Sequence, residues 1–286
     1  MSYLSYFRWR RMVWSTIFAA IPSSLYAVDG VVLIDQSHAL AGNVTPGDAP
    51  GFPVTISQSG SYRLSGNLVV PDATGSGIQI TAPYVTLDLN GFGIIGPVVC
   101  TSGSTEPATC PPATDGIGIR AANATGEGGP AGVKVFNGTV RGMGGSGIFI
   151  VGLGSSVERV TADGNGGLGM IVAGRVIHSS ANTNGQSGIF ATTVSDSNAN
   201  NNHLDGITLD AAGGVSIGNV ASFNGRNGIL APNGTVTGNT VVRNVSFGIS
   251  ATCPSSIVAN TVVGNTAGSI DTSRDGCVVV NNATRP

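Results

Sequence analysis

The amino-acid sequence predicts an all-β solenoid, in which the chain winds into stacked coils of about 20 residues. The first observation is a short phrase, Gly followed by a long or branched apolar residue, that recurs through the second half of the chain. Its glycines are Gly147, Gly169, Gly188, Gly206, Gly228 and Gly248. A regular spacing near ~20 residues is typical of solenoids, because each coil must return to the same point of the cross-section.

The second observation is strand-like alternation after each of these glycines. Two places beyond the apolar residue the sequence is again small or apolar, as at Ile150, Ala191 and Leu209. This alternation is typical of strands with one buried face. The strands are expected to stack one column of isoleucines in the interior: Ile189, Ile207, Ile229 and Ile249.

The third observation is an asparagine four residues before each of the last five of these glycines. The series is Asn165, Asn184, Asn202, Asn224 and Asn244. Asn tolerates left-handed backbone and bonds to nearby backbone groups, so it suits a tight corner. Coils stack roughly 4.8 Å apart, and the amides are therefore expected to form a structural ladder along the axis. A second series is expected at Asn219, Asn239, Asn260 and Asn281, with Asn198 joining it after a one-residue shift.

The start of the chain is typical of an export signal. Three arginines between positions 8 and 11 precede an apolar run over residues 12–21, and a plausible cleavage site ends at Ala27. We therefore expect residues 1–27 to be a signal peptide and the protein to be secreted, to the periplasm, the cell surface or the medium. The alternative is an N-terminal membrane anchor, although the apolar run is short for a bilayer. No stable membrane span is expected after processing.

The rest of the chain is expected to form one domain. Residues 28–66 are less periodic and are expected to form an N-terminal cap with the first strands, because the open end of a solenoid leaves backbone groups unpaired. Residues 67–286 are expected to form the parallel β-helix. A loop rich in Pro, Ser and Thr interrupts it at residues 97–115.

Two stretches near the first coils carry a resemblance to a known group. Residues 60–68 (GSYRLSGNL) and residues 85–96 (VTLDLNGFGIIG) resemble the opening coils of secreted bacterial β-helix repeat proteins of the pectate-lyase-like superfold. With the general right-handed crossover preference, the resemblance implies a single-stranded right-handed parallel β-helix. It implies little about activity, because this superfold hosts lyases, hydrolases, epimerases and non-enzymes.

The motifs of enzymes with this superfold are absent. The sequence lacks the Asn-Thr-Asp, Asp-Asp, Gly-His-Gly and Arg-Ile-Lys motifs of galacturonan hydrolases and the Asp-Pro-His motif of alginate epimerases. Asn182-Thr183-Asn184 comes closest, but it lacks the carboxylate required for general acid catalysis. No aspartates share a repeat position in the way that a calcium site would need. We therefore expect neither a metal nor a cofactor.

One set of ionisable residues does share a repeat position. Arg159, His178 and Asp196 each lie ten residues before the glycine of their coil, so three consecutive coils are expected to stack them. They are the candidate catalytic or sugar-binding residues. The alternative, which we favour, is a solvated ladder of neighbouring opposite charges. Arg141 and Asp163 share another position, where a surface ion pair would contribute roughly 0–1 kcal/mol.

Four cysteines in an exported chain predict two disulfides, for which three connectivities exist. Cys100–Cys110 would close the inserted loop. Cys253–Cys277 would join adjacent coils near the C-terminal end, because the two residues are about one coil apart.

Composition limits the partners. Charged residues make up 10% of the chain, the formal net charge is −2, and no basic patch is present, so a nucleic-acid partner is not expected. The sequence favours a secreted or cell-surface β-helix that is non-catalytic and either binds an extracellular polysaccharide or has a structural role. The alternative is a polysaccharide lyase or glycoside hydrolase with an atypical site.

Overall fold

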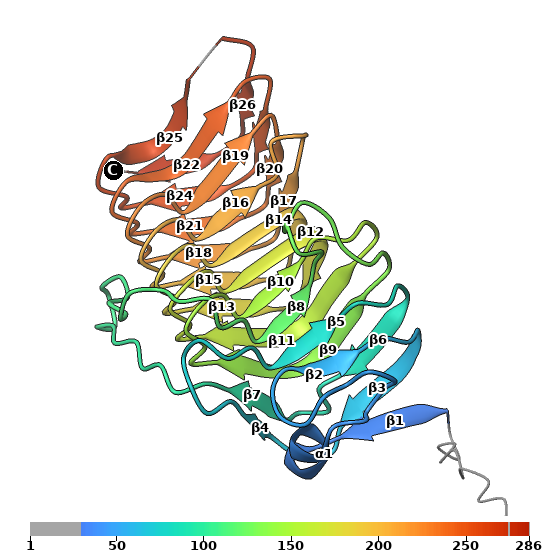
Figure 1. Cartoon of the computed structure of the whole chain (residues 1–286). Helices are drawn as coiled ribbons and strands as arrows, with labels where there is room; N and C mark the ends of the chain where they lie inside the picture. The colour runs from blue at the N-terminus through green and yellow to red at the C-terminus, as the bar shows by residue number, and fades with distance from the viewer. Residues whose placement is uncertain (1–29, 274, 286) are drawn as a thin grey trace, which may run out of the picture.

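A computed structural model describes residues 30–273 and 275–285, which form a right-handed parallel β-helix (Figure 1). All pairings between its named strands are parallel, and each coil pairs with the coil before it and the coil after it. The predicted fold class is confirmed. The expected signal peptide, residues 1–27, lies outside the described residues.

Three strand-rich faces surround one interior. Face 1 consists of β2 (Val54–Ile56), β5 (Ile78–Ile80), β8 (Ile119–Ala121), β10 (Ile148–Ile150), the first parts of β12 (Met170–Ile177) and β14 (Ile189–Ser195), β16 (Ile207–Leu209), β19 (Ile229–Pro232), β22 (Phe247–Thr252) and β25 (Gly268–Thr272). Face 2 consists of β1 (Val31–Ile34), β3 (Gly60–Leu64), β6 (Val85–Asp88), the first parts of β9 (Lys134–Arg141) and β11 (Ser156–Asp163), the second parts of β12 and β14, β17 (Val215–Ile217), β20 (Thr235–Thr237), β23 (Ser256–Val258) and β26 (Val278–Val280). Face 3 consists of β4 (Leu68–Val69), β7 (Gly93–Ile95), the second parts of β9 and β11, β13 (Ser180–Asn182), β15 (Asn198–Asn200), β18 (Val220–Ser222), β21 (Thr240–Val242), β24 (Thr261–Val263) and β27 (Ala283–Arg285).

A short helix, α1 (Gln36–Ala41), lies at the N-terminal end of the stack (Figure 1). Asp35 begins it, because its carboxylate accepts a hydrogen bond from the backbone N–H of His38 at 2.9 Å. The Gln36 amide then pairs with the backbone of Val69, accepting from its N–H at 2.7 Å and donating to its carbonyl at 3.2 Å. A side chain thereby replaces a neighbouring strand, which supports the proposal that residues 28–66 cap this end.

The core is one continuous column of apolar side chains. Ile189, Ile207, Ile229 and Ile249 are register partners on four successive coils and are fully buried. The predicted interior column is confirmed. Alternation explains it, because every second residue of these short strands points inward and the interior is only wide enough for side chains.

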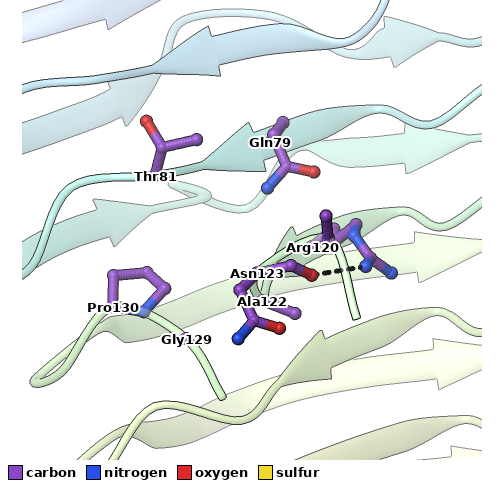
Figure 2. A pocket seen from close by; sticks show the side chains of 8 residues that line it. Gln79, Thr81, Arg120, Ala122, Asn123, Gly129 and Pro130 are labelled. Atoms are coloured by element: carbon purple, nitrogen blue, oxygen red, sulfur yellow. Dashed lines mark hydrogen bonds between the residues drawn. The ribbon is translucent and has the colours of Figure 1, made fainter. Parts of the chain in front are cut away.

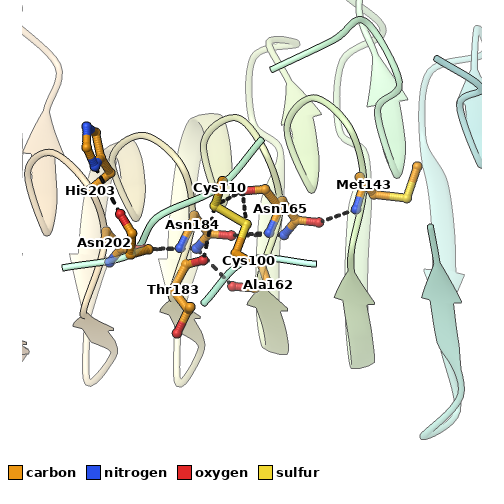
Figure 3. The surroundings of a disulfide bond; sticks show 10 residues. Cys100, Cys110, Met143, Ala162, Asn165, Thr183, Asn184, Asn202 and His203 are labelled. Carbon is orange, nitrogen blue, oxygen red and sulfur yellow. Dashed lines mark hydrogen bonds between the residues drawn. A yellow bond between two sulfur atoms is a disulfide. The ribbon is translucent and has the colours of Figure 1, made fainter. Parts of the chain in front are cut away.

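A ladder of buried amides runs along the corner between faces 3 and 1 (Figure 3). It consists of Asn165, Asn184, Asn202, Asn224, Asn244 and Asn265. In each step the backbone N–H and the side-chain N–H of one Asn donate to the Oδ1 of the next, at 2.9–3.1 Å. The same side-chain nitrogen also donates to a backbone carbonyl, so every buried polar atom of the amide is bonded.

The second ladder, between faces 2 and 3, differs from the expectation. Its amides are Asn219, Asn239, Asn260 and Asn282, preceded on the earlier coils by Ser179 and Ser197. Placing Asn198 and Asn281 in this ladder was wrong. Asn198 is an outward residue of β15, and Asn281 has a left-handed backbone (φ 55°) and an exposed side chain.

Both ladders follow one local rule that explains this error. A residue with left-handed backbone turns the corner, and the residue directly after it enters the ladder. Thr183 (φ 56°) precedes Asn184, Gly218 (φ 66°) precedes Asn219, and Asn281 precedes Asn282 in the same way. Where two asparagines are adjacent, the second is the ladder residue.

Replacing Ile229 with Asp is expected to unfold the protein at ambient temperature or to lower its free energy of unfolding by several kcal/mol, because an unpaired charge would be buried. Ile217→Asp is the matched control, since Ile217 is 43% exposed on face 2 and the same change should cost less than ~1 kcal/mol. Denaturant titrations of the two variants make the comparison. Equal effects would contradict the register of face 1.

Replacing Asn202 with Ala is expected to destabilise the protein by about 2–5 kcal/mol, because buried hydrogen-bonding groups of Asn184 and the backbone carbonyl of Ala181 lose their partner. Asn198→Ala is the control, because this side chain is exposed and donates or accepts no bond among the described residues. Calorimetric melting of both proteins decides the matter. A loss below ~1 kcal/mol for Asn202→Ala would show that the ladder amides add little.

Candidate functional site

Face 1 carries an unusual set of outward side chains. They are register partners on successive coils, all half-buried, and we call them the outer stripe: Gln79, Arg120, Phe149, Ile171, Phe190, Thr208 and Leu230. The outward positions of a sheet that faces water are usually polar. Four apolar residues, two of them aromatic, therefore form an apolar line that the interior does not require.

Arg120 fixes one end of this apolar line. Its guanidinium lies 5.3 Å from the centre of the Phe149 ring, within cation–π range. It also donates to the backbone carbonyl of Asn123 at 3.0 Å. These two contacts hold a permanent positive charge at the junction of polar and apolar stripe residues.

Two clefts open on either side of Arg120. One has a volume of about 520 Å³ and lies beside the loop at residues 122–130; Figure 2 shows Gln79, Arg120 and Asn123 around it. The other, about 340 Å³, is lined by Arg120, Phe149 and Ile171 and by residues 113–117. Loop walls therefore flank the part of the outer stripe that runs from Gln79 to Ile171.

The inserted loop, residues 97–115, supplies the second of these walls. Cys100 and Cys110 form a disulfide within it, and Cys253 and Cys277 form the other, as the sequence predicts. The loop crosses several coils of the β-helix along the first Asn ladder (Figure 3). We call it the strap.

Hydrogen bonds fasten the strap to coils remote in sequence. The N–H of Ala108 donates to the carbonyl of Asn201 at 2.8 Å, and the Asn201 amide donates to the carbonyl of Glu106 at 2.8 Å. The His203 ring donates through Nδ1 to the carbonyl of Ala108 at 2.9 Å. Both sides of the strap thus border defined surfaces, with face 1 on one side and face 3 on the other.

The sequence candidates Arg159, His178 and Asp196 lie elsewhere, on the corner between faces 2 and 3. All three have left-handed backbone, and their side chains are more than half exposed. His178 Nε2 lies 3.9 Å from Asp196 Oδ2. Arg159 instead bonds to the Glu158 carboxylate and donates to the Asn137 side chain at 2.8 Å.

The structure thus brings His178 and Asp196 together and directs Arg159 to the preceding coil. Arg159 lines a separate cleft of about 270 Å³ together with Lys134 and Glu158, and neither His178 nor Asp196 is among the residues that line it. Within residues 30–273 and 275–285, no group of three His, Cys, Asp or Glu residues is placed to hold a metal ion. The same residues include no helix of the length and hydropathy that would cross a membrane.

The outer stripe was not among the predicted sites, although the sequence carries a signal for it. Gly-Ile-Phe occurs twice, at residues 147–149 and 188–190, and in both places the Phe directly follows the buried isoleucine. Strand alternation places this Phe on the outer surface, so the recurring outward aromatic residue predicts an exposed apolar line.

No protein-family model and no curated protein sequence matches this chain. Among solved structures, the Dettilon tailspike protein aligns with a TM-score of 0.51 and 14% identity, over 81% of this chain and 52% of the tailspike. The chain thus spans about half the length of that protein. The periplasmic alginate epimerase AlgG aligns with a TM-score of 0.49 and 14% identity over 88% and 82% of the two chains. The A-module of the mannuronan C-5 epimerase AlgE6 of Azotobacter vinelandii gives 0.44 and 15% over 79% and 80%. The likeness to the tailspike establishes a shared fold alone.

His178→Ala is expected to leave the melting temperature within about 2 °C of the wild type, because an exposed pair at this distance contributes little. Wild-type protein is expected to release no product from pectate, alginate or neutral glucans in reducing-sugar and unsaturated-product assays. Turnover of any of these polymers that disappears in His178→Ala would assign a catalytic role to the corner.

Proposed function

We propose that this protein is a secreted or cell-surface β-helix that binds an extracellular polysaccharide along the outer stripe and does not cleave it. The observation that carries the proposal is the apolar line of Phe149, Ile171, Phe190 and Leu230 on an outer face, which ends at Arg120, where two clefts open. Export is supported by the two disulfides, which form and persist in oxidising compartments.

The geometry suits a long, flat ligand. Sugar rings have apolar faces of C–H groups, and aromatic side chains offer a rigid apolar surface of matching size. Phe149 and Phe190 are two coils apart, or roughly 10 Å along the axis. A chain lying along the axis would therefore meet an aromatic ring, an aliphatic side chain and a second aromatic ring in turn.

The charge of the stripe favours an acidic polymer. The Arg120 guanidinium lies over the Phe149 ring and, within the described residues, bonds only to the carbonyl of Asn123, which leaves other N–H groups for a carboxylate on a sugar ring. Gln79, its register partner on the preceding coil, supplies an amide for sugar hydroxyls. The ligand class that fits best is a polysaccharide containing uronic acid.

Binding is better supported than cleavage. Glycoside hydrolysis uses two carboxyl groups on opposite sides of the scissile bond. Among the residues that line the two stripe clefts, Asp115 is the single carboxylate. The residues that line these clefts therefore do not supply the pair of carboxyl groups that a glycoside hydrolase would use.

The test is a glycan array followed by calorimetric titration of the best acidic polymer with wild type, Phe149→Ala and Phe190→Ala. Each substitution is expected to weaken binding about fivefold or more, since an aromatic contact is worth about 1 kcal/mol. Phe223→Ala is the matched control, because Phe223 is not a stripe residue. It lies at the corner between faces 3 and 1, and its ring is 5.9 Å from the Arg243 guanidinium. Polymer binding that ignores both stripe substitutions would overturn the proposed surface, and product release would overturn the non-catalytic role.

A further inference from the structure

A third cleft lies on the other side of the strap, apart from the outer stripe. Its volume is about 280 Å³, and it opens between the base of the strap and the ends of β9 and β11 on face 3. One wall consists of residues 97–100. The opposite wall carries Arg141 and Asp163, the pair that shares a repeat position.

The strap wall is apolar and firmly held. Pro97, Val98 and Val99 line it, and Val99 is 74% exposed. The N–H of Val98 donates to the carbonyl of Gly142 at 2.8 Å, which fixes the wall to the coil. The adjacent Cys100 is anchored through its disulfide to Cys110. An exposed apolar wall beside a charged pair suits a ligand that has one apolar surface and polar edges.

The polar wall is prepared for a ligand. Arg141 and Asp163 are register partners on adjacent coils, yet no ion pair joins them. Within the described part of the chain, the Arg141 side chain has no hydrogen-bond or ion-pair partner. The floor between the walls is open at Gly164, where a side-chain carbon would meet no atom within 4 Å. The Arg141 guanidinium therefore lines the cleft with its N–H groups available to a ligand.

We infer that this cleft is a second binding site, which takes a single sugar acid, a ring bearing one carboxylate and several hydroxyls. Arg141 would pair with the carboxylate in a bidentate arrangement, and Asp163 would bond to a ring hydroxyl. Pro97 and the two valines would cover the apolar face of the ring. A dianion such as phosphate is disfavoured, because Asp163 lies beside the only cation of the cleft. This site is independent of the outer stripe and of the proposed function.

The site should respond to pH in a defined direction. Burial raises the pKa of Asp163, an effect that outweighs the Thr183 hydrogen bond and the Arg141 charge, which lower it. Arg141 on β9 is the one other ionisable side chain among the residues that line the cleft, and Asn182 on β13, the register partner on the far side, is neutral. As pH falls through the raised pKa, Asp163 becomes neutral and its repulsion of the ligand carboxylate disappears. Affinity should therefore rise until the ligand itself is protonated.

The experiment is calorimetric or NMR titration of the full protein with D-galacturonic acid, with D-galactose and inorganic phosphate as comparison probes. Arg141→Gln is expected to weaken binding about tenfold or more, and Asp163→Asn to abolish the rise in affinity at lower pH. Arg175→Gln, at an exposed Arg on face 2, should bind as the wild type does. Phe149→Ala tests separately whether any of the signal comes from the outer stripe.

Melting temperatures of all variants establish that they are folded. A further comparison with the trimer of galacturonic acid distinguishes a site for free sugar acids from one for units of a chain. Three results would each overturn the inference: no galacturonate binding by the wild type, equal binding of galactose, or equal binding by Arg141→Gln. Loss of binding in Phe149→Ala would instead assign the signal to the outer stripe.

Discussion

The hydrogen bonding of buried amides between coils is the constraint on which this structure depends. Each corner would otherwise bury backbone N–H groups without partners, at a cost of about 1–3 kcal/mol for each group. Asn meets the need because one side chain both accepts from the coil before it and donates to the coil after it. Ser179 and Ser197 satisfy fewer of these groups, because each has a single hydroxyl, which accepts the backbone N–H of the coil before it. The ladders also fix the register, since a coil displaced by one residue would lose the whole set.

The same constraint decides what the faces can carry. Inward positions must be apolar and of suitable size, and the ladder positions must be polar and short. Outward positions are free of both demands, so Phe149, Phe190 and Arg141 need another explanation. Residue identity at outward positions and beside the strap is therefore the better guide to function, because the stacking of the coils requires no particular residue there.

Much of the fold was predictable from the sequence, because the period, the alternation and the Asn series are local signals. The placement of Asn198 and Asn281 failed by one residue, since the left-handed turn before each ladder position depends on backbone angles that two adjacent polar residues do not reveal. The triad of Arg159, His178 and Asp196 followed from correct register, but register alone does not say whether a corner is enclosed. The cleft beside Phe149 and the cleft at Asp163 depend on where the strap docks, which long-range contacts decide.

The strap also changes how the molecule responds to stress. In a simple solenoid each coil contacts only its neighbours, so coils at one end can open while the others persist. Here the segment that leaves the stack after β7 is bonded to Asn201 and His203, several coils further on. The coils between these points are tied into one cooperative unit and must exchange their amide hydrogens together, whereas the coils beyond His203 remain free to fray from the C-terminal end. The Cys253–Cys277 crosslink lies in that outer region, where the strap gives no support.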